Sequence, residues 1–286
     1  MDLQSLRFFR TVASEGSFSK AAHKLNYAQS NLSTKILQLE RELQVTLLYR
    51  HSHGVSLTPK GELLLTYADE LLRLADETSR VIADDGTAKG ALTIGSMEST
   101  AISFLPQLLS SYHRDNPNVS ITVKTGTTEA AIRGVLEHTL DGAFVAGNLN
   151  HPDLETRFVK NEHLMLVTSS VDSLPLTPEY LSGESLLVFP QGCSYRRILE
   201  QWLKDQNIFS ENVMEFDSLG AIIASISAGL GISLFPESAV RAYASGGILT
   251  CHEIPPEYAL VPIVFVYRKH EFIESSLQNF IDSIQI

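Results

Sequence analysis

The stretch between residues 17 and 43 constrains the fold more than any other part of the chain. It holds two short helical patterns joined by a turn, "NYAQ". Ser17 precedes the first pattern as an N-cap, and Asn26 ends it, because asparagine tolerates the left-handed conformation that terminates a helix. The second pattern repeats apolar side chains at helical spacing: Leu32, Ile36, Leu39 and Leu43. The stretch therefore predicts a helix-turn-helix, and an ordinary helical hairpin is the alternative.

The outward face of the second helix is small and polar. A rotation of about 100° per residue places these side chains opposite or beside the apolar stripe: Ser30, Ser33, Thr34, Gln38 and Arg41. A helix with such a face fits the major groove of DNA, which is about 12 Å wide. The pattern thus indicates a module that reads DNA.

Charge is distributed unevenly along the chain. The formal net charge is −11, yet residues 1–60 hold eight Lys and Arg against four Asp and Glu, so this front part carries +4 and the rest −15. A basic module on an acidic body is expected where the module meets phosphate and the body repels nonspecific contact with it. The alternative is a solvated surface of mixed charge.

A hairpin follows the helix-turn-helix. In "LLYRHSHGVSLTPKGELLL" the segment "HSHG" forms a turn between two β-prone pieces, and "TPKGE" starts the next helix. This arrangement predicts a wing, with Arg50, His51 and His53 as donors to the DNA backbone or the minor groove. The two histidines also allow a metal site, but no acidic or thiol partner lies nearby in the sequence.

A heptad pattern runs between residues 60 and 84. Apolar positions repeat there in alternating steps of three and four: Leu64, Tyr67, Leu71, Leu74, Thr78 and Val81. A solitary helix cannot hide such a stripe, so we expect it to pair with a second copy of the chain. Packing against the C-terminal domain of the same chain is the alternative. The small polar segment "ADDGTAKG", residues 83–90, is interpreted as a hinge.

The remaining residues alternate between strand-like and helix-like stretches. The strand candidates are "ALTIGS", "NVSITVKTG", "LDGAFVAG", "HLMLVTS", "LLVFPQG", "GISLFP" and "PIVFVYRK". Helical runs such as "FLPQLLSSYH", "YRRILEQWLKD" and "LGAIIASISAG" separate them. This order predicts an α/β domain with largely parallel sheets, in which ligands bind beyond the carboxyl ends of the strands.

The composition favours a protein of the cytoplasm. No apolar run approaches the roughly 18 residues of a membrane span, and the N-terminus lacks a secretory leader. Only Cys193 and Cys251 are present, which is too few for a disulfide scaffold, and they form no metal-binding pair. We therefore expect no membrane contact, no metal and no cofactor.

The chain resembles the LysR-type transcriptional regulators over its whole length. The most specific stretch is "LRFFRTVASEGSFSKAAHKLNYAQSNLSTKILQLERELQVTLLYRHSHGVSLTPKGELLL", and "FLPQLLSSYHRDNPNVSITVKTG" and "SISAGLGISLFPESAV" resemble the effector domain of the family. The resemblance implies an α+β protein with three parts. These are a winged helix-turn-helix at residues 1–58, a dimerising linker helix and hinge at 59–90, and a two-lobed α/β effector domain at 91–286, similar to type 2 periplasmic binding proteins. It also implies a dimer or tetramer on double-stranded promoter DNA, with RNA polymerase as a further partner.

The expected DNA contacts lie in the first 58 residues. They are Ser19, Lys20, Gln29, Ser30, Asn31, Ser33, Thr34, Lys35, Arg50 and His53. Gln29, Ser33 and Thr34 are assigned to base edges, and Ser30, Lys35, Arg50 and His53 to phosphate or the minor groove. The chain departs from the common family pattern at Thr34, where Arg is usual, at Gln44, where Gly is usual, and at His53. Threonine lacks the bidentate grip that arginine has on guanine.

Three strand-to-helix junctions are the candidate effector site. "GSMEST", "GTTE" and "QGCSYRR" together supply Ser96, Ser99, Thr100, Thr127, Thr128, Ser194 and Arg196. Hydroxyls and free N–H groups at helix starts favour a small polar metabolite, more readily an anion, although Glu98 opposes one and leaves the charge of the ligand open. The alternative for the hydroxyls is simple helix capping.

Other functions of the C-terminal part have weaker support. An enzyme is disfavoured because "GISLF" and "GLG" are incomplete nucleophile and dinucleotide motifs, and no catalytic residue is assigned. A free-standing solute-binding protein needs a leader peptide and has no use for the basic front. A regulator without a ligand stays open, as does a redox sensor through Cys193, which lies at a helix start that favours a thiolate.

Overall fold

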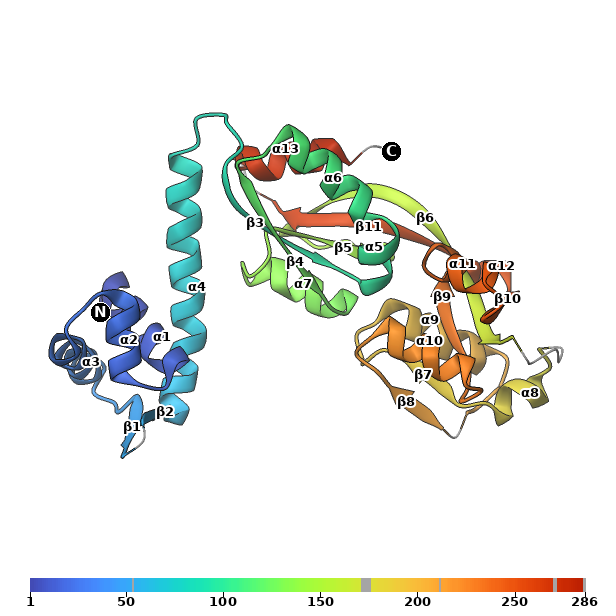
Figure 1. The fold of residues 1–286 in the computed structure, drawn as a ribbon, viewed down its shortest axis with the longest axis horizontal. Helices are drawn as coiled ribbons and strands as arrows, with labels where there is room; N and C mark the ends of the chain where they lie inside the picture. The colour runs from blue at the N-terminus through green and yellow to red at the C-terminus, as the bar shows by residue number, and fades with distance from the viewer. Residues whose placement is uncertain (53, 171–175, 211, 270–271, 285–286) are drawn as a thin grey trace. The chain divides into compact units, whose positions relative to one another are not determined.

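The structure is a computed structural model that describes residues 1–286 except 53, 171–175, 211, 270–271 and 285–286. Its contacts divide the chain into two compact units, Met1–Ala83 and Asp84–Ile286. Each unit is described by itself (Figure 1). Among the described residues, no helix combines the length and the apolar character that a bilayer span requires.

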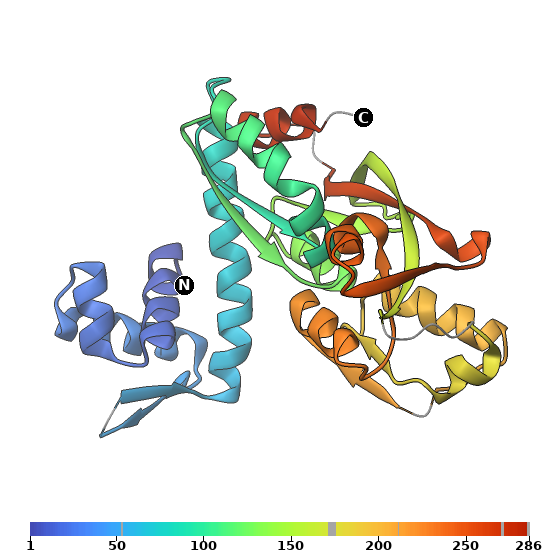
Figure 2. The same cartoon turned by 45° about the vertical axis from the view of Figure 1, so that its right-hand side comes forward.

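The first unit is a winged helix-turn-helix followed by a long helix. Its elements are α1 Leu3–Glu15, α2 Phe18–Leu25, α3 Gln29–Leu43, β1 Leu48–His51, β2 Gly54–Leu57 and α4 Pro59–Ile82. Strands β1 and β2 pair antiparallel and form the expected wing, which projects from the helices in Figure 2. The helix-turn-helix and the wing are thus confirmed.

Small and large apolar side chains interlock in the core of the helical module. Ala21 and Ala22 of α2 are buried, which lets α3 approach closely and seat Leu32 and Ile36 against Phe9 of α1. Complete burial of side chains as large as these contributes about 1.5–3 kcal/mol each. The core therefore holds α3 in a defined orientation with its polar face outward.

Helix α4 starts at a well-formed cap. The Thr58 hydroxyl accepts from the Gly61 N–H at 3.0 Å, and Pro59 occupies the first helical position, where its missing N–H costs nothing. A Cβ on Gly61 would lie 2.1 Å from the Leu47 carbonyl oxygen, so only glycine fits at this crossing. The sequence "TPKGE" thus begins a helix as predicted.

One face of α4 packs on its own module and another is exposed. Ala68 and Leu72 are buried against Leu6 of α1, and Leu64 packs with the same cluster. The exposed apolar side chains of this helix are Leu63, Tyr67, Leu71, Leu74 and Ile82. The predicted stripe is therefore present from Tyr67 to Leu74, but Leu64 belongs to the inner face and Leu63 takes its place.

The second unit is a mixed α/β domain. Its first half contains β3 Gly90–Ser96, α5 Glu98–Ser103, α6 Leu105–Asp115, β4 Val119–Thr125, α7 Thr128–Leu136, β5 Gly142–Ala146, β6 Leu154–Ser169, α8 Pro178–Gly183 and β7 Leu186–Val188. Its second half contains α9 Ser194–Asp205, β8 Val213–Glu215, α10 Leu219–Ser227, β9 Ser233–Pro236, α11 Glu237–Ser245, β10 Leu249–Glu253, α12 Pro256–Ala259, β11 Leu260–Arg268 and α13 Ser275–Ser283.

The expectation of largely parallel sheets is wrong. The main sheet has the order β10-β6-β11-β5-β3-β4, with β9 on β6. Only the β3–β4 and β3–β5 pairs in it are parallel, whereas β11 is antiparallel to both β5 and β6. The reason is that β11 returns to the first part of the domain from the far end of the chain and enters the sheet in the opposite direction.

Alternating side chains bury both faces of this sheet. On β5, Phe144 packs under α6 and α13 with Phe265, while Ala143 and Val145 pack against α7. Figure 1 shows α6 and α13 side by side on one face, with α7 on the other. This first lobe therefore places the starts of α5 and α7 beyond the carboxyl ends of β3 and β4.

Strand β6 joins this lobe to a second one. Its first part, from Leu154 to His163, pairs with β11, and its last part pairs with β9 and β10. The second lobe adds the parallel pair β7–β8 and a core in which α10 packs on Phe235. Because β6 belongs to both lobes, the two share one hydrophobic core cluster.

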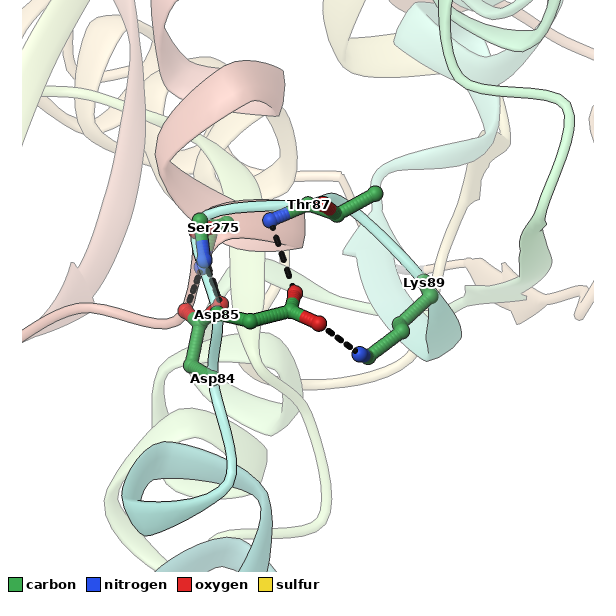
Figure 3. A network of polar contacts seen from close by, with 6 residues as sticks. Asp84, Asp85, Thr87, Lys89 and Ser275 are labelled. Carbon is green, nitrogen blue, oxygen red and sulfur yellow. Dashed lines mark hydrogen bonds and ion pairs between the residues drawn. The ribbon is translucent and has the colours of Figure 1, made fainter.

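The segment predicted as a hinge is anchored to the end of the chain. The Asp84 carboxylate accepts from the Ser275 N–H at 2.6 Å and from the Ser275 hydroxyl at 2.9 Å, at the start of α13 (Figure 3). Asp85 accepts from the Thr87 N–H and the Lys89 ammonium within the same loop. Residues 84–89 therefore form an ordered clip at the edge of the second unit.

We expect Asp84→Ala to destabilise the second unit in a pH-dependent way. The Ser275 N–H holds the pKa of the Asp84 carboxyl below its ordinary value of 3.8. A lowered pKa stabilises the fold above the ordinary value, and this contribution is lost as the pH falls through the folded-state value. The free energies of unfolding of wild type and variant, measured by urea titration, should differ more at pH 7 than at pH 3.

The matched control is Asp85→Ala, which removes contacts only within the loop. It should destabilise the protein less than Asp84→Ala at pH 7. Equal gaps between Asp84→Ala and wild type at both pH values would contradict the role of the Asp84 charge.

Candidate functional site

Helix α2 has the predicted caps at both ends. The Ser17 side chain accepts from the Lys20 N–H, and Asn26 ends α2 in the left-handed conformation with φ at 52°. Helix α3 begins at Gln29, and no side chain caps its first N–H groups. The start of α3 is thereby open to an external acceptor such as a phosphate.

The exposed face of α3 carries the residues assigned to base edges. Gln29 and Thr34 are exposed and Ser33 is half-buried, and the Thr34 hydroxyl donates to the Ser30 carbonyl at 2.9 Å. The Ser19 hydroxyl of α2 donates to the Gln29 amide oxygen at 2.8 Å, which orients that side chain. The polar face is therefore partly preorganised by contacts within the helix-turn-helix.

Arg50 connects the wing to the two helices. Its Nη1 donates to Ser33 Oγ at 3.1 Å, and its guanidinium lies 4.9 Å from the centre of the Phe18 ring. Contacts of this kind limit the rotamers of an exposed arginine, so less conformational entropy is lost when it meets a phosphate. The structure thus brings Arg50 and Ser33 together.

The other assigned side chains of this module are also accessible. Lys20 and Asn31 are exposed, as is Ser19, and Lys35 is half-buried. His53 lies outside the described residues. His51 Nε2 pairs with the Ser56 hydroxyl across the hairpin at 2.9 Å. The described residues hold no group of three or more His, Cys, Asp or Glu side chains arranged for a metal ion.

A cavity of about 290 Å³ lies in the second unit, where several strand-to-helix junctions meet. Its lining comes from the starts of α5 and α7, the end of β4, the β7–α9 junction and the segment after β8. The residues are Met97, Glu98, Ser99, Thr125, Gly126, Thr127, Thr128, Phe189, Pro190, Cys193, Tyr195 and Asp217. Convergent polar groups in a concave site of this size suit a small ligand.

Hydrogen bonds between the lobes run on two sides of this region. Glu98 Oε2 of α5 accepts from the Leu219 N–H at the start of α10, at 2.7 Å. The Glu129 N–H of α7 donates to the Gly192 carbonyl at 3.2 Å. Each contact joins a helix start of one lobe to the other lobe, so a ligand in the cavity lies between groups that hold the lobes together.

The structure brings three of the seven assigned residues to the cavity. Ser99, Thr127 and Thr128 line it. Thr127 is also the N-cap of α7 and accepts from the Ala130 N–H, which is the capping role that the sequence left open. The Thr128 hydroxyl donates to the Met97 sulfur at 3.4 Å, a weak acceptor that a ligand oxygen can replace.

The other four assigned residues have partners or positions away from the lining. The Ser96 hydroxyl donates to the Met97 carbonyl, and the Ser194 hydroxyl to the Ala146 carbonyl at 3.0 Å. Thr100 is buried on α5 outside the lining, and its hydroxyl has no hydrogen-bond partner among the described residues. The hydroxyls of Ser96 and Ser194 hold backbone around the cavity rather than facing it.

Arg196 is committed to a structural cluster. It is 8% exposed, and its guanidinium donates to Glu200 and Glu215, both at 2.7 Å, and to the Phe189 carbonyl at 3.1 Å. The guanidinium therefore crosslinks α9, β8 and the segment after β7. The two carboxylates already neutralise it, which removes the reason for assigning it to a ligand anion.

Two buried hydroxyls at the cavity lie against each other, and neither has any other hydrogen-bond partner among the described residues. They belong to Ser99 and Tyr195, each 3% exposed. Burial raises the pKa of the Tyr195 phenol, so it stays a proton donor throughout the physiological range. A buried hydroxyl without a partner costs about 1–3 kcal/mol, which a ligand with suitable acceptors would recover.

Sequence reasoning missed several members of the lining. Tyr195 lies at a recognised junction, and its large polar side chain beside Cys193 was the available signal. Asp217 follows the short strand β8, which has an exposed, unpatterned sequence and gave no strand signal. Asp217 reaches the cavity because β8 pairs with β7, and this pairing has no local signal in the sequence.

Cys193 lines the cavity as a buried thiol. Burial raises its pKa, and the N–H groups of Tyr195 and Arg196 oppose this shift only in part. Cys251 lies on β10, and burial raises its pKa as well. Reactive cysteines have lowered pKa values, so these environments do not favour redox sensing.

Comparison with known proteins identifies the family. Residues 3–62 match the profile described as "Bacterial regulatory helix-turn-helix protein, lysR family", and residues 85–285 match "LysR substrate binding domain". The chain belongs to the LysR family. It is 43% identical to the HTH-type transcriptional regulator CzcR of Bacillus thuringiensis subsp. konkukian (strain 97-27), over 100% of this chain and 97% of that protein. It is 42% identical to the HTH-type transcriptional regulator GltR of Bacillus subtilis (strain 168), over 98% and 95%.

Solved structures of LysR-type proteins share the fold. Full-length CbnR in complex with its target DNA aligns with a TM-score of 0.72 at 24% identity, over 99% of both chains. A full-length OxyR variant from Pseudomonas aeruginosa aligns with a TM-score of 0.69 at 23% identity, over 99% of this chain and 94% of that one. The predicted fold class is thereby confirmed.

Membership in the LysR family gives the general function. The chain is a DNA-binding transcriptional regulator with an effector-binding domain, and its relatives are regulators rather than enzymes. LysR regulators bind promoter DNA and effector ligands and form oligomers. The resemblance seen in the sequence is thus confirmed.

Proposed function

We propose that residues 1–58 bind an imperfectly palindromic promoter site as part of a dimer, and that a small polar metabolite in the cavity changes this binding. The dimer, or a tetramer built from it, acts where the chromosome lies, in the cytoplasm, and influences RNA polymerase at the promoter. The observation that carries the ligand-dependent part is the pair of buried hydroxyls of Ser99 and Tyr195 at the cavity, which have no partner but each other among the described residues.

The polar face of α3 supports the DNA-binding part of the proposal. Gln29, Ser33 and Thr34 address base edges in the major groove, with Ser19 and Asn31 beside them. Phosphate or minor-groove contacts come from Ser30, Lys20, Lys35, Arg50 and His53. A local charge of +4 on each front module is enough for this, since the far acidic surface need not touch DNA.

The exposed stripe of α4 supports pairing of two copies. Tyr67, Leu71 and Leu74 are 56%, 41% and 48% exposed on one helix face. Apolar residues at heptad spacing form such a seam when two helices supercoil. Pairing through α4 would bring two helix-turn-helix modules to the two halves of one operator.

The first experiment is selection of bound fragments from sheared genomic DNA by the purified full-length protein. We expect enrichment of sites with dyad symmetry, and the enriched sites identify the regulated promoters. The same selection with pools of small polar metabolites should change the enriched set or its affinity. Recovery of random fragments in every condition would contradict sequence-specific binding.

Removing hydroxyls from the cavity should impair the response to the effector. We expect Ser99→Ala with Thr128→Val to raise the effector concentration for half-maximal response by about tenfold or more, because each lost partner costs about 1–3 kcal/mol. Promoter affinity without ligand should stay near that of the wild type. The measurement is fluorescence anisotropy of labelled operator DNA over an effector titration.

Thr122→Val is the matched control for these variants. Thr122 is exposed on β4, outside the cavity lining, so its loss should leave the response unchanged. A wild-type response in the Ser99→Ala, Thr128→Val protein would mean that the effector binds elsewhere.

A further inference from the structure

The charge of the cavity lining is negative. Glu98 and Asp217 are its acidic members, and no Lys, Arg or His occurs among the described residues that line it. Arg196, the basic side chain nearest in sequence to this junction, is occupied by Glu200 and Glu215. A ligand with only negative charges would meet two carboxylates and no cationic side chain to offset them.

The Glu98 carboxylate is held in place by the other lobe. Its Oε2 accepts from the Leu219 N–H at 2.7 Å, so the carboxylate occupies the start of the nine-residue helix α10. This position is where a ligand anion would otherwise find free N–H groups. Because Glu98 also lines the cavity, it offers a ligand a carboxylate whose position is fixed.

Hydrogen-bond donors converge on the same cavity from other elements. The Ser99 and Tyr195 hydroxyls are buried and lie against each other, with no other partner among the described residues, and the Thr128 hydroxyl has only a sulfur acceptor. These three groups can donate to the oxygens of a carboxylate without any charged side chain. The cavity thus combines a site for a positive group with donors for a negative one.

From this distribution we propose, building on the effector cavity proposed above, that the effector carries an ammonium group beside a carboxylate, as an amino acid does. The ammonium lies at Glu98 and Asp217, and the carboxylate accepts from Ser99, Thr128 and Tyr195. A cavity of about 290 Å³ is at the small end for ligand sites, which suits a single amino acid or an amine-bearing metabolite of similar size. A simple dicarboxylate would instead place a second negative charge beside Glu98 and Asp217.

The test uses three matched sets of compounds on the full-length protein. They are the proteinogenic α-amino acids, the 2-oxo acids that replace their ammonium by a keto group, and the primary amines that lack their carboxylate. Isothermal titration calorimetry measures binding. We expect at least one amino acid to bind, and to bind about tenfold or more tightly than both its 2-oxo acid and its amine.

A carboxylate variant tests the position of the ammonium. Glu98→Gln retains an oxygen for the Leu219 N–H but removes the charge, and it should lower the affinity for the amino acid by about tenfold while the affinity for the 2-oxo acid holds or rises. The matched control is Glu129→Gln, at an exposed carboxylate of α7 that pairs with Arg133 outside the lining. Its amino-acid affinity should equal that of the wild type. Thermal unfolding without ligand shows whether each variant is folded.

The outcomes separate this inference from the proposed function. Preference for a 2-oxo acid, with binding lost in Ser99→Ala, overturns the ammonium but leaves the effector cavity. Equal amino-acid binding in the wild type and a folded Glu98→Gln protein also overturns it. Binding that Ser99→Ala and Thr128→Val leave unchanged overturns the cavity itself. Failure of every amino compound to bind overturns the inference outright.

Discussion

Replacing Leu71 and Leu74 of α4 by glutamate weakens self-association of the chain by several orders of magnitude. Both side chains are exposed in the single chain, so burial in a seam with a second copy would contribute about 1.5–3 kcal/mol for each. A symmetric seam contains two copies of each leucine, and every 1.4 kcal/mol changes the dissociation constant about tenfold. Sedimentation equilibrium over a range of concentrations measures the effect.

One matched control makes this result specific to the seam. Thr66→Glu with Ser79→Glu adds the same charge to α4 at exposed polar positions and should weaken association far less. Leu72 must be avoided, because it is buried against Leu6 and its replacement by a charged residue would destabilise the module. An intact dimer of the Leu71→Glu, Leu74→Glu protein with α4 still paired, as detected by spin labels on this helix, would refute the seam.

Replacing Ser30 and Thr34 of α3 by glutamate lowers promoter affinity by about 100-fold or more. The substitutions remove the contact of Thr34 with a base edge, which costs about 1–3 kcal/mol, and the contact of Ser30 with phosphate or the minor groove. They also place two negative charges against phosphate and lower the charge of the front module from +4 to +2. Since both positions are exposed, the fold should tolerate the change. Anisotropy titrations at two salt concentrations measure affinity and its salt dependence.

The control adds the same charge to a different surface of the module. Gln4→Glu with Ser14→Glu adds two negative charges on exposed positions of α1, and promoter affinity should fall much less. Equal losses in both double variants would mean that net charge alone governs binding, and α3 would lose its assigned role.

Local patterns predicted the first unit well because its contacts are local. Ser17 and Asn26 cap α2, and the stripe of Leu32, Ile36 and Leu39 packs inward, as the spacing indicated. Every one of these interactions joins residues close in the chain or repeats at helical spacing. The misplacement of Leu64 has a simple cause, since α4 buries one face on α1 and neighbouring apolar positions look equivalent in a heptad pattern.

The sequence predicted which strand-to-helix junctions form the effector site, but not which of their side chains line the cavity. All three junctions reach the cavity, because strand ends and helix starts are set by local sequence. The role of each hydroxyl depends on which backbone lies beside it. Ser194 meets the Ala146 carbonyl, from 48 residues earlier in the chain, and thus turns away from the lining.

By itself the sequence determined the family, the helix-turn-helix with its wing, the exposed polar face of α3 and the positions of most strands of the second unit. Tertiary structure decided the direction of β11, the commitment of Arg196 to Glu215, the anchoring of Asp84 by Ser275 and the acidic lining at Glu98 and Asp217. The physical reason is that periodicity and capping express interactions between near neighbours. The partner of a buried charge or of an edge strand depends instead on segments that only the folded chain brings together.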